Sequence, residues 1–268
     1  MKIPFICVNY NTADETIKYI ENVRTLEGSS DAVIVVVDNS PNEEDFARLV
    51  AFTDQNLYPK EEVVILRREN RGYFQGLNDG IAYAKQTGRC NSFFIVGNND
   101  IVFKNDFITQ LKQNAFDEEV FVLAPDIVTT EGSHENPHVI DRIGFLRKFK
   151  YDVYYSNYFL ATVMSKIKST ERRYKPYDPE RKIIHMGIGA LYVLTPSFFK
   201  HFHQLWEDVF LYGEEAILAG QLQSKNGKIL YEPSLICYHN ESATTSKMES
   251  KAKYYIVKKS YKTYRKYL

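Results

Sequence analysis

The sequence predicts an α/β protein built on a mostly parallel β-sheet. Up to residue 125, apolar runs of strand length alternate with amphipathic segments of helical length, which is the pattern of βαβ units. Small polar residues follow several of these runs, at the sheet edge where α/β proteins bind their ligands. With 268 residues, 44% of them hydrophobic and 25% charged, the chain has an ordinary globular composition and ample material for a core.

Strands and helices are expected to alternate in this first half. The apolar runs that favour strands, because they are rich in β-branched residues, are 3–8, 32–37, 63–66, 93–96 and 120–124. The segments between them with helical periodicity are 12–26, 43–52, 75–87 and 106–114. Thr12 and Glu15 have the spacing of a capping box, which predicts the start of the first helix.

After Pro125 the alternation ends. Residues 126–185 mix turn-forming, basic and aromatic residues, and we expect an irregular insertion facing the substrate rather than a second domain. Beyond it, the sequence predicts a strand at 191–194, helices at 197–203 and 214–224, and short strands at 228–231 and 235–238.

Charge and cysteine content exclude several classes of protein. The formal net charge is zero, so nothing points to a nucleic-acid partner. Cys7, Cys90 and Cys237 form no CxxC pair, which favours a reducing compartment over a disulfide framework or a zinc site. Because the chain starts in a strand-like run and has no apolar stretch of membrane-spanning length, we expect a cytoplasmic protein.

Two strand ends carry acidic residues that suit a ligand. The run at 93–96 leads into Asn98-Asn99-Asp100, an oxygen-rich tip that suits a hard divalent cation and, through it, a diphosphate. Asp38 ends the second strand, where a carboxylate can accept hydrogen bonds from the N–H or hydroxyl groups of a ligand. The alternative at both places is a turn, since Asn and Asp are common turn residues.

A second dense motif covers residues 70–80. Gly72 allows a tight loop, and Gly76 allows the following helix to pack close to the sheet or a ligand. Asn70 and Arg71 would reach a phosphate or a base at the start of that helix, although close helix packing alone also explains the glycines. No phosphate-loop motif occurs, and the GxG at Gly187 and Gly189 lacks a third glycine.

Taken together, these pieces resemble the family-2 glycosyltransferases with the GT-A fold, of the group that includes rhamnosyltransferases and capsule or O-antigen transferases. The resemblance covers nearly the whole chain in the order of the family. It is carried by Val8-Asn9-Tyr10-Asn11, Val36-Val37-Asp38-Asn39-Ser40, Asn70-Arg71-Gly72-Tyr73, Asn98-Asn99-Asp100, Phe210-Leu211-Tyr212-Gly213-Glu214-Glu215, Pro233, His239 and Ser242.

The resemblance implies a Rossmann-like GT-A domain over residues 1–246, with a nucleotide-sugar-binding half at 1–125 and an acceptor-binding, catalytic half at 126–246. Asp38 would contact a uracil or thymine base, and Asp100 with His239 would hold Mg²⁺ or Mn²⁺. Asn98 departs from the DxD form of the metal motif, so the first ligand would be neutral. The remaining donor-binding residues implied by the resemblance are Asn9, Asn11, Asn70, Arg71, Gly72, Asn98 and Asn99.

Glu214 and Glu215 are the predicted catalytic residues. Inverting transfer needs a base within reach of the acceptor hydroxyl, and two adjacent carboxylates raise each other's pKa. By position in the family motif Glu215 would be the base, although the family usually has aspartate there and further acids where this chain has Ala216-Ile217-Leu218. The alternative is that both acids only stabilise a helix N-terminus.

The expected activity is transfer of a sugar from a UDP- or dTDP-sugar to a hydroxyl of a glycan or lipid-linked acceptor, in cell-surface polysaccharide synthesis. Two alternatives remain open at this point. A sugar nucleotidyltransferase would need a glycine-rich, basic loop near the N-terminus, which Val8-Asn9-Tyr10-Asn11 is not. A catalytically degenerate scaffold is suggested by Asn98 and by glutamate at position 215.

The tail at 247–268 interleaves lysines with tyrosines, as in Lys258, Lys259 and Tyr261. Such a helix suits the headgroup region of an anionic membrane, which would place the protein at the inner face of the plasma membrane. The alternative is a terminal helix that packs on the domain through its tyrosines.

Overall fold

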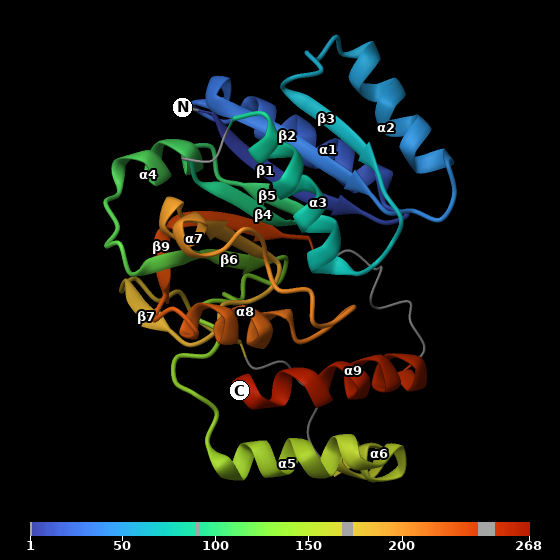
Figure 1. The fold of residues 1–268 in the computed structure, drawn as a ribbon, viewed down its shortest axis with the longest axis vertical. Helices are drawn as coiled ribbons and strands as arrows, with labels where there is room; N and C mark the ends of the chain where they lie inside the picture. Colours follow the sequence, from blue (N-terminus) through green and yellow to red (C-terminus); the bar gives the residue numbers. More distant parts are fainter. Residues whose placement is uncertain (1, 89–91, 168–173, 241–249) are drawn as a thin grey trace.

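A computed structural model describes residues 2–88, 92–167, 174–240 and 250–268 (Figure 1). The strands are β1 (Ile3–Asn9), β2 (Ala32–Asp38), β3 (Val63–Arg67), β4 (Phe94–Asn98), β5 (Ile101–Phe103), β6 (Val120–Thr129), β7 (Lys182–Ile184), β8 (Leu191–Leu194) and β9 (Lys228–His239). The α-helices are α1 (Ala13–Thr25), α2 (Glu44–Gln55), α3 (Tyr73–Gln86), α4 (Phe107–Gln113), α5 (Phe145–Ser156), α6 (Tyr158–Ile167), α7 (Pro196–His201), α8 (Glu214–Gln223) and α9 (Ser250–Tyr264), with 3₁₀ turns at Ser29–Asp31 and Arg265–Tyr267.

The strands form one curled sheet in the order β3-β2-β1-β4-β8-β6-β9-β5, with β7 paired to β9. Strands β3, β2, β1 and β4 run parallel, whereas β8 runs antiparallel to both β4 and β6. The register pairs Asn9 with Asp38, Asp38 with Arg67, and Val8 with Asn98. The carboxyl ends of these four strands therefore meet at one edge, and the predicted α/β class is confirmed.

Both faces of the sheet are buried because successive side chains of a strand point to opposite sides. Phe5 packs with side chains of α1 and α4, while its neighbour Ile6 packs with side chains of α3, α7 and α8. A third cluster joins α8 to α9 and includes Ile217 and Tyr264. The two main clusters explain why the parallel strands are apolar along their whole length.

The prediction of an irregular insertion at 126–185 is wrong in part. Helices α5 and α6 form there, and β6 extends to Thr129. The tyrosine-rich sequence hid the helical pattern, because α5 is partly exposed on every side and has no fully buried residue to mark a core face. The two short strands expected after residue 228 are one continuous strand, β9, whose register with β6 shifts between Pro125 and Asp126.

The predicted capping box is also absent. Thr12 precedes α1, but its side chain makes no capping hydrogen bond. The other boundaries in the first half lie within a few residues of those expected. Cys7 and Cys237 are free and buried, and Cys90 lies outside the described residues.

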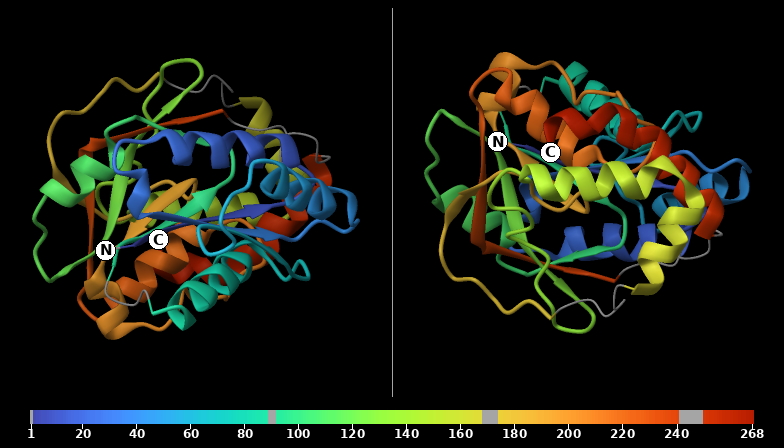
Figure 2. Two further views of the ribbon diagram at one scale, coloured as in Figure 1. Left: turned by 90° about the horizontal axis from the view of Figure 1, so that it is seen from above. Right: turned by 90° about the horizontal axis from the view of Figure 1, so that it is seen from below.

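A layer of helices lies below the sheet in the view of Figure 1, with α9 next to the domain and α5 and α6 beyond it. The same arrangement is seen from below in Figure 2, where α5 crosses in front of the rest of the chain. Tyr254, Tyr261 and Tyr264 of α9 are buried, so the described part of the tail packs on the domain through its tyrosines, which was the alternative to a membrane-binding tail. None of the helices in the described parts of the chain has the length and apolar character needed to cross a membrane.

Candidate active site

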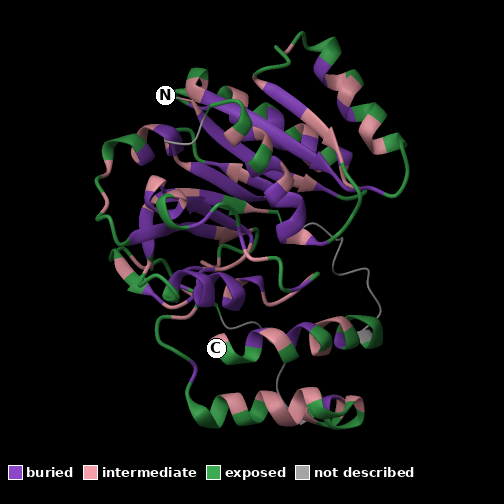
Figure 3. Cartoon of the chain, viewed as in Figure 1, coloured by how far each residue is buried: buried purple, intermediate pink, exposed green. Residues whose placement is uncertain are grey.

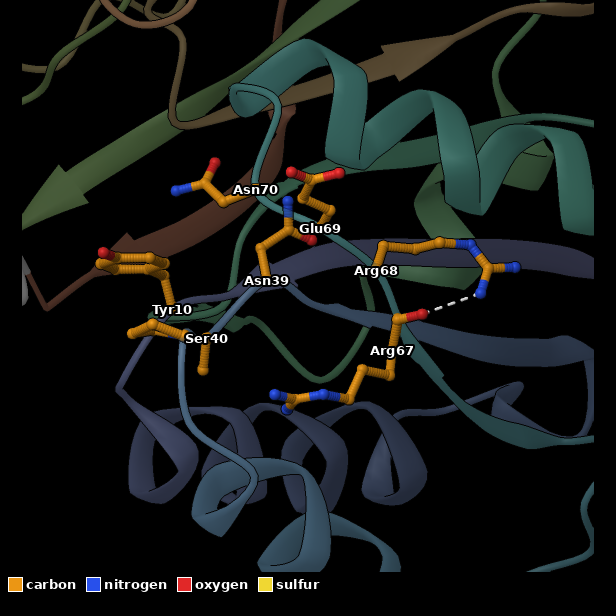
Figure 4. Close-up of a pocket in the computed structure, with 8 residues that line it drawn as sticks. Tyr10, Asn39, Ser40, Arg67, Arg68, Glu69 and Asn70 are labelled. Carbon is orange, nitrogen blue, oxygen red and sulfur yellow. Dashed lines mark hydrogen bonds between the residues drawn. The ribbon is translucent and has the colours of Figure 1, made fainter.

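A pocket of about 440 Å³ opens at the carboxyl ends of β1, β2 and β3 (Figure 4). Its walls are the segments that follow these strands, and its lining residues are Tyr10, Asn39, Ser40, Pro41, Arg67, Arg68, Glu69 and Asn70. The side-chain oxygen of Asn39 is buried and has no hydrogen-bond partner among the described residues. The pocket thus combines an aromatic ring, two guanidinium groups and amide groups, which suits a nucleotide.

Asp38 lies beneath this pocket and is fully buried. Its carboxylate accepts hydrogen bonds from Asn9 Nδ2 at 2.8 Å, from Ser40 Oγ at 2.6 Å and from Arg67 Nη1 at 2.8 Å. Ser40 Oγ in turn accepts from the backbone N–H of the exposed Asn11, at 2.9 Å. Asp38 therefore orders two residues that line the pocket, and its direct contact with a base stays a prediction.

Asn99 and the side-chain oxygen of Asn9 contact the start of α1. Asn99 Nδ2 donates to the hydroxyls of Thr12, at 2.8 Å, and Thr16, at 2.7 Å. The Thr16 hydroxyl donates onward to Asn9 Oδ1, at 2.8 Å. This buried network occupies the Thr12 hydroxyl, which explains the missing cap, and it locks the turn that presents Asp100.

Asp100 and His239 lie side by side, as predicted. Asp100 Oδ1 is 3.4 Å from His239 Nε2, and Glu135 Oε2 is 3.0 Å from Nδ1 on the other side of the ring. Burial lowers the pKa of His239, but hydrogen bonds and charge from Asp100 and Glu135 outweigh it and raise the pKa to about 10. His239 is therefore an imidazolium between two carboxylates when no other cation is present.

A divalent cation fits this donor set. A carboxylate and an imidazole suit Mn²⁺ or Mg²⁺, and the contact from Glu135 to the opposite nitrogen would orient the ring. Within the described parts of the chain, no group of three or more His, Cys, Asp or Glu side chains could hold a metal ion. The protein would thus supply about two ligands and leave the remainder to phosphate oxygens and water, as is usual at such sites.

Tyr73 connects this tip to the predicted catalytic acid. Its hydroxyl donates to Asn98 Oδ1 at 2.8 Å and to the carbonyl of Gly189 at 3.3 Å. The backbone N–H of Gly189 donates to Glu215 Oε1 at 3.2 Å, and Asn98 Nδ2 lies 3.4 Å from His239 Nε2. A continuous series of polar contacts therefore links His239 with Glu215.

Glu214 and Glu215 begin α8 and face different surroundings. Glu214 is buried, and its Oε1 has no hydrogen-bond partner among the described residues. Burial, with the charge of Glu215, raises the pKa of Glu214 to about 8, and burial also raises the pKa of Glu215. Two acids whose pKa values lie nearer neutrality than usual are suited to proton transfer.

Glu215 lines a second cavity, of about 230 Å³, whereas Glu214 does not. The cavity lies between α8, α5 and the C-terminal residues, and it is lined by His138, Val139, Ile143, Arg147, Tyr151, Tyr155, Met186, Gly213, Glu215, Ala216, Tyr264 and Leu268. Tyr264 packs so closely on Gly213 that a Cβ there would lie 2.1 Å from the ring. Helix α9 is thus a wall of the site rather than a free tail.

The motif at 70–80 holds the segment that leads into α8. Gly72 has a φ of 130°, and a Cβ on it would lie 2.7 Å from the carbonyl of Phe210. Gln75 and Asn78 donate to backbone carbonyls at 207 and 205, at 3.1 and 2.9 Å. Gly76 packs on Val8, so close packing against the sheet is confirmed.

Of the donor-binding residues predicted in this motif, Asn70 lines the pocket at the carboxyl ends of β1 to β3. Arg71 instead pairs with Asp79, with both contacts at 2.9 Å. The donor-binding roles of Arg71 and Gly72 stay predictions.

Several residues of the site were not predicted to belong to it. Arg67 and Gly189 touch the predicted residues directly, and Glu135 lies in the segment that was read as irregular. A signal existed for Arg67, which follows a strand as Asp38 and Asp100 do. No signal existed for Glu135, because its partner His239 is 104 residues away.

Comparison with known proteins agrees with this geometry. The model of glycosyl transferase family 2 matches residues 5–178, so the chain belongs to this family. No curated protein matches the chain.

Three solved structures illustrate the likeness in fold. The mannosyltransferase PcManGT from Pyrobaculum calidifontis, in complex with GDP-Man and Mn²⁺, is 14% identical with a TM-score of 0.57, over 91% of this chain and 58% of that one. GalNAc-T7 with UDP, GalNAc and Mn²⁺ is 12% identical with a TM-score of 0.57, over 90% and 44%. S. aureus TarS is 11% identical with a TM-score of 0.55, over 91% and 37%.

The chain thus spans 58% or less of the length of these three proteins. At such low identity the likeness shows the fold, which is GT-A, and the activity has to be argued from the site itself.

Proposed function

We propose that the protein is an inverting, metal-dependent glycosyltransferase of hexosyl or rhamnosyl type. It would move a sugar from a UDP- or dTDP-sugar to a hydroxyl of a glycan or lipid-linked acceptor in cell-surface polysaccharide synthesis. The observation that carries the proposal is the position of Glu215. Its carboxylate lines a cavity on one side and is linked through Gly189 and Tyr73 to Asn98, beside Asp100 and His239, on the other.

The donor would bind with its nucleoside in the pocket at the ends of β1 to β3. The ring of Tyr10 offers a stacking surface, and Asn39, Ser40 and Asn70 offer polar groups to the nucleoside. Asn39 would accept a hydrogen bond from a base N–H, since its side-chain oxygen otherwise lacks a partner among the described residues. The complexes of similar fold contain GDP-Man or UDP with Mn²⁺, which supports a nucleoside diphosphate and a divalent cation here as well.

In the proposed reaction, the acceptor hydroxyl enters the cavity and gives its proton to Glu215 as the oxygen attacks the anomeric carbon. The attack comes from the side opposite the nucleotide, so the bond to the diphosphate breaks with inversion. Asp100 and His239 would hold the cation, which when bound neutralises charge on the departing diphosphate. Glu214 is buried beside the base, and burial together with the charge of Glu215 raises its own pKa.

The proposal is tested by thermal unfolding with UDP, dTDP, GDP and ADP, each with and without Mn²⁺. Nucleotide at a hundred times its Kd adds about 2.7 kcal/mol to the free energy of unfolding, which raises the melting temperature of a domain of this size by about 5–10 °C. The metal-dependent part of the shift should vanish in Asp100→Ala and persist in Asp54→Ala, an exposed control on α2.

Glu215→Gln should bind the nucleotide normally and lose about 10²–10⁴-fold in turnover. No shift with any nucleotide would favour a catalytically degenerate scaffold. A fully active Glu215→Gln would reject the assignment of the base.

A further inference from the structure

Helices α5 and α6 expose large apolar side chains on the outside of the molecule. Phe145, Leu146 and Phe149 of α5 are 80%, 75% and 56% exposed, and Phe159 of α6 is 73% exposed. Leu160 and Val163 of α6 are exposed as well. Figure 3 shows these helices at the bottom of the view, as a mixture of exposed and intermediate residues.

The apolar residues of α5 lie on one face. At about 100° per residue, Phe145, Phe149 and Leu146 fall within an arc of about 100°. Tyr151 and Tyr155 lie on the opposite face, where Tyr155 packs on Tyr261 of α9 with the ring centroids 4.5 Å apart. The helix therefore uses its tyrosine face for contact with the protein and turns its more apolar face outward, the reverse of a usual surface helix.

Positive charge borders this face. By the same helical geometry the exposed Lys150 lies about 40° beyond Leu146, and Lys166 is exposed at the end of α6. Asp152, the acid nearest the apolar arc, is engaged at 2.6 Å by both Arg265 and Tyr261. Helix α9, which packs beside α5, adds the exposed lysines Lys251, Lys259 and Lys262.

We propose that this face is a docking surface for an anionic lipid bilayer, on which α5 and α6 lie parallel to the membrane plane. Contiguous apolar patches are rare on soluble monomers and mark interaction sites. An apolar face bordered by lysines matches acyl chains beneath anionic headgroups. A second copy of the chain fits less well, because a two-fold interface would bring the same lysines together.

The surface also differs from the one expected from the sequence, which was the C-terminal tail alone. In α9 the tyrosines Tyr254, Tyr261 and Tyr264 are buried against the protein, so α9 offers mainly charge. The apolar contribution comes from α5 and α6. The two helices and α9 together would form the membrane-facing layer.

The docked orientation has a consequence for the acceptor, and this step rests on the proposed function. The inward face of α5 supplies Arg147, Tyr151 and Tyr155 to the cavity that contains Glu215. A bilayer against the outward face would thus lie one helix away from the cavity. An acceptor with a lipid anchor would then reach Glu215 while its anchor stays in the membrane.

The test is flotation of the full chain with vesicles of phosphatidylcholine alone or with phosphatidylglycerol added. Wild type should float with the anionic vesicles only, and less so as salt is raised. The triple substitution Phe145→Ser, Phe149→Ser and Phe159→Ser should lower binding by at least about tenfold. Leu57→Ser, which removes an 87% exposed leucine distant from the face, should bind as wild type.

A second variant, Lys150→Glu with Lys166→Glu, keeps the apolar face and should also lower anionic binding at least about tenfold. The proposal is overturned if wild type does not bind the anionic vesicles, or if the triple variant binds them as wild type does. A dimer that the triple variant disperses, without vesicle binding, would overturn it in favour of self-association. Because flotation uses no donor or acceptor, its result is independent of the proposed sugar transfer.

Discussion

Replacing Glu214 with glutamine is expected to stabilise the protein at neutral and alkaline pH. Glu214 is buried, and one carboxylate oxygen has no hydrogen-bond partner among the described residues. Burial and the charge of Glu215 raise its pKa from 4.5 to about 8. Glutamine has nearly the same shape as the protonated acid and carries no charge, so it removes the cost of ionising this side chain inside the protein.

The size of the effect follows from linkage. The folded-state pKa lies above the unfolded-state value, so the folded protein holds the proton between about pH 4.5 and pH 8. The contribution of the protonated Glu214 to the stability of the wild type is therefore full below about pH 4.5, and it is lost as the pH rises from there through 8. At about 1.4 kcal/mol per pH unit, roughly 3 kcal/mol is lost by pH 7 and about 5 kcal/mol by pH 9.

The assay is thermal unfolding of wild type and Glu214→Gln from pH 5 to pH 9. The variant should melt about 5–10 °C above the wild type near pH 7, with a smaller difference at pH 5. Glu61→Gln, at an exposed turn, is the matched control and should follow the wild type. A variant that is equally destabilised at every pH would show that Glu214 is ionised and well solvated. Glu214 would then not hold a proton in the folded protein near neutral pH.

Three further predictions concern the site. Because burial raises the pKa of Glu215, kcat/KM should increase with pH through an apparent pKa above that of an ordinary glutamate, and a profile flat above pH 5 would contradict its role as base. Gly189→Ala places a Cβ 2.8 Å from Glu215 Oε1 and should lower kcat about tenfold or more with nucleotide binding intact, whereas Gly144→Ala, with no atom within 4 Å, should leave kinetics unchanged. Asp38→Asn weakens the ion pair with Arg67 and should lower the free energy of unfolding by about 2–3 kcal/mol, measured by denaturant unfolding. It should also lower nucleotide affinity, measured by calorimetric titration. Asp79→Asn, which breaks the more exposed pair with Arg71, should cost less than about 1 kcal/mol.

Several features of the site could be predicted from the sequence, because they depend on residues that are neighbours along the chain. Asp38 directly follows an apolar run and Asp100 follows another within four residues, and the parallel order of β1, β2 and β4 brings both to one edge of the sheet. Glu214 and Glu215 stand at the start of a helix, as the helix predicted over 214–224 implied. Family membership, carried by short motifs in a fixed order, is confirmed by the match over residues 5–178.

Helices α5 and α6 were not predicted from the sequence pattern. Their aromatic and basic residues follow no core-facing stripe, because α5 turns Phe145 and Phe149 outward and packs through tyrosines. Amphipathic patterns are read on the assumption that the apolar face is the buried one. A helix that presents its apolar face to another environment defeats that assumption.

The α/β class, the order of most elements and the chemical groups available at each strand end could all be predicted from the amino-acid sequence. Periodicity and polar strand ends are local properties, so a single sequence shows them before the fold is known. The tertiary structure was needed to show which glutamate lines a cavity, that Arg67 engages Asp38, and that Tyr73 joins Asn98 to Gly189, which is 116 residues from Tyr73. These pairings depend on strand order and register, which bring distant segments within hydrogen-bonding distance and which no spacing along the chain records.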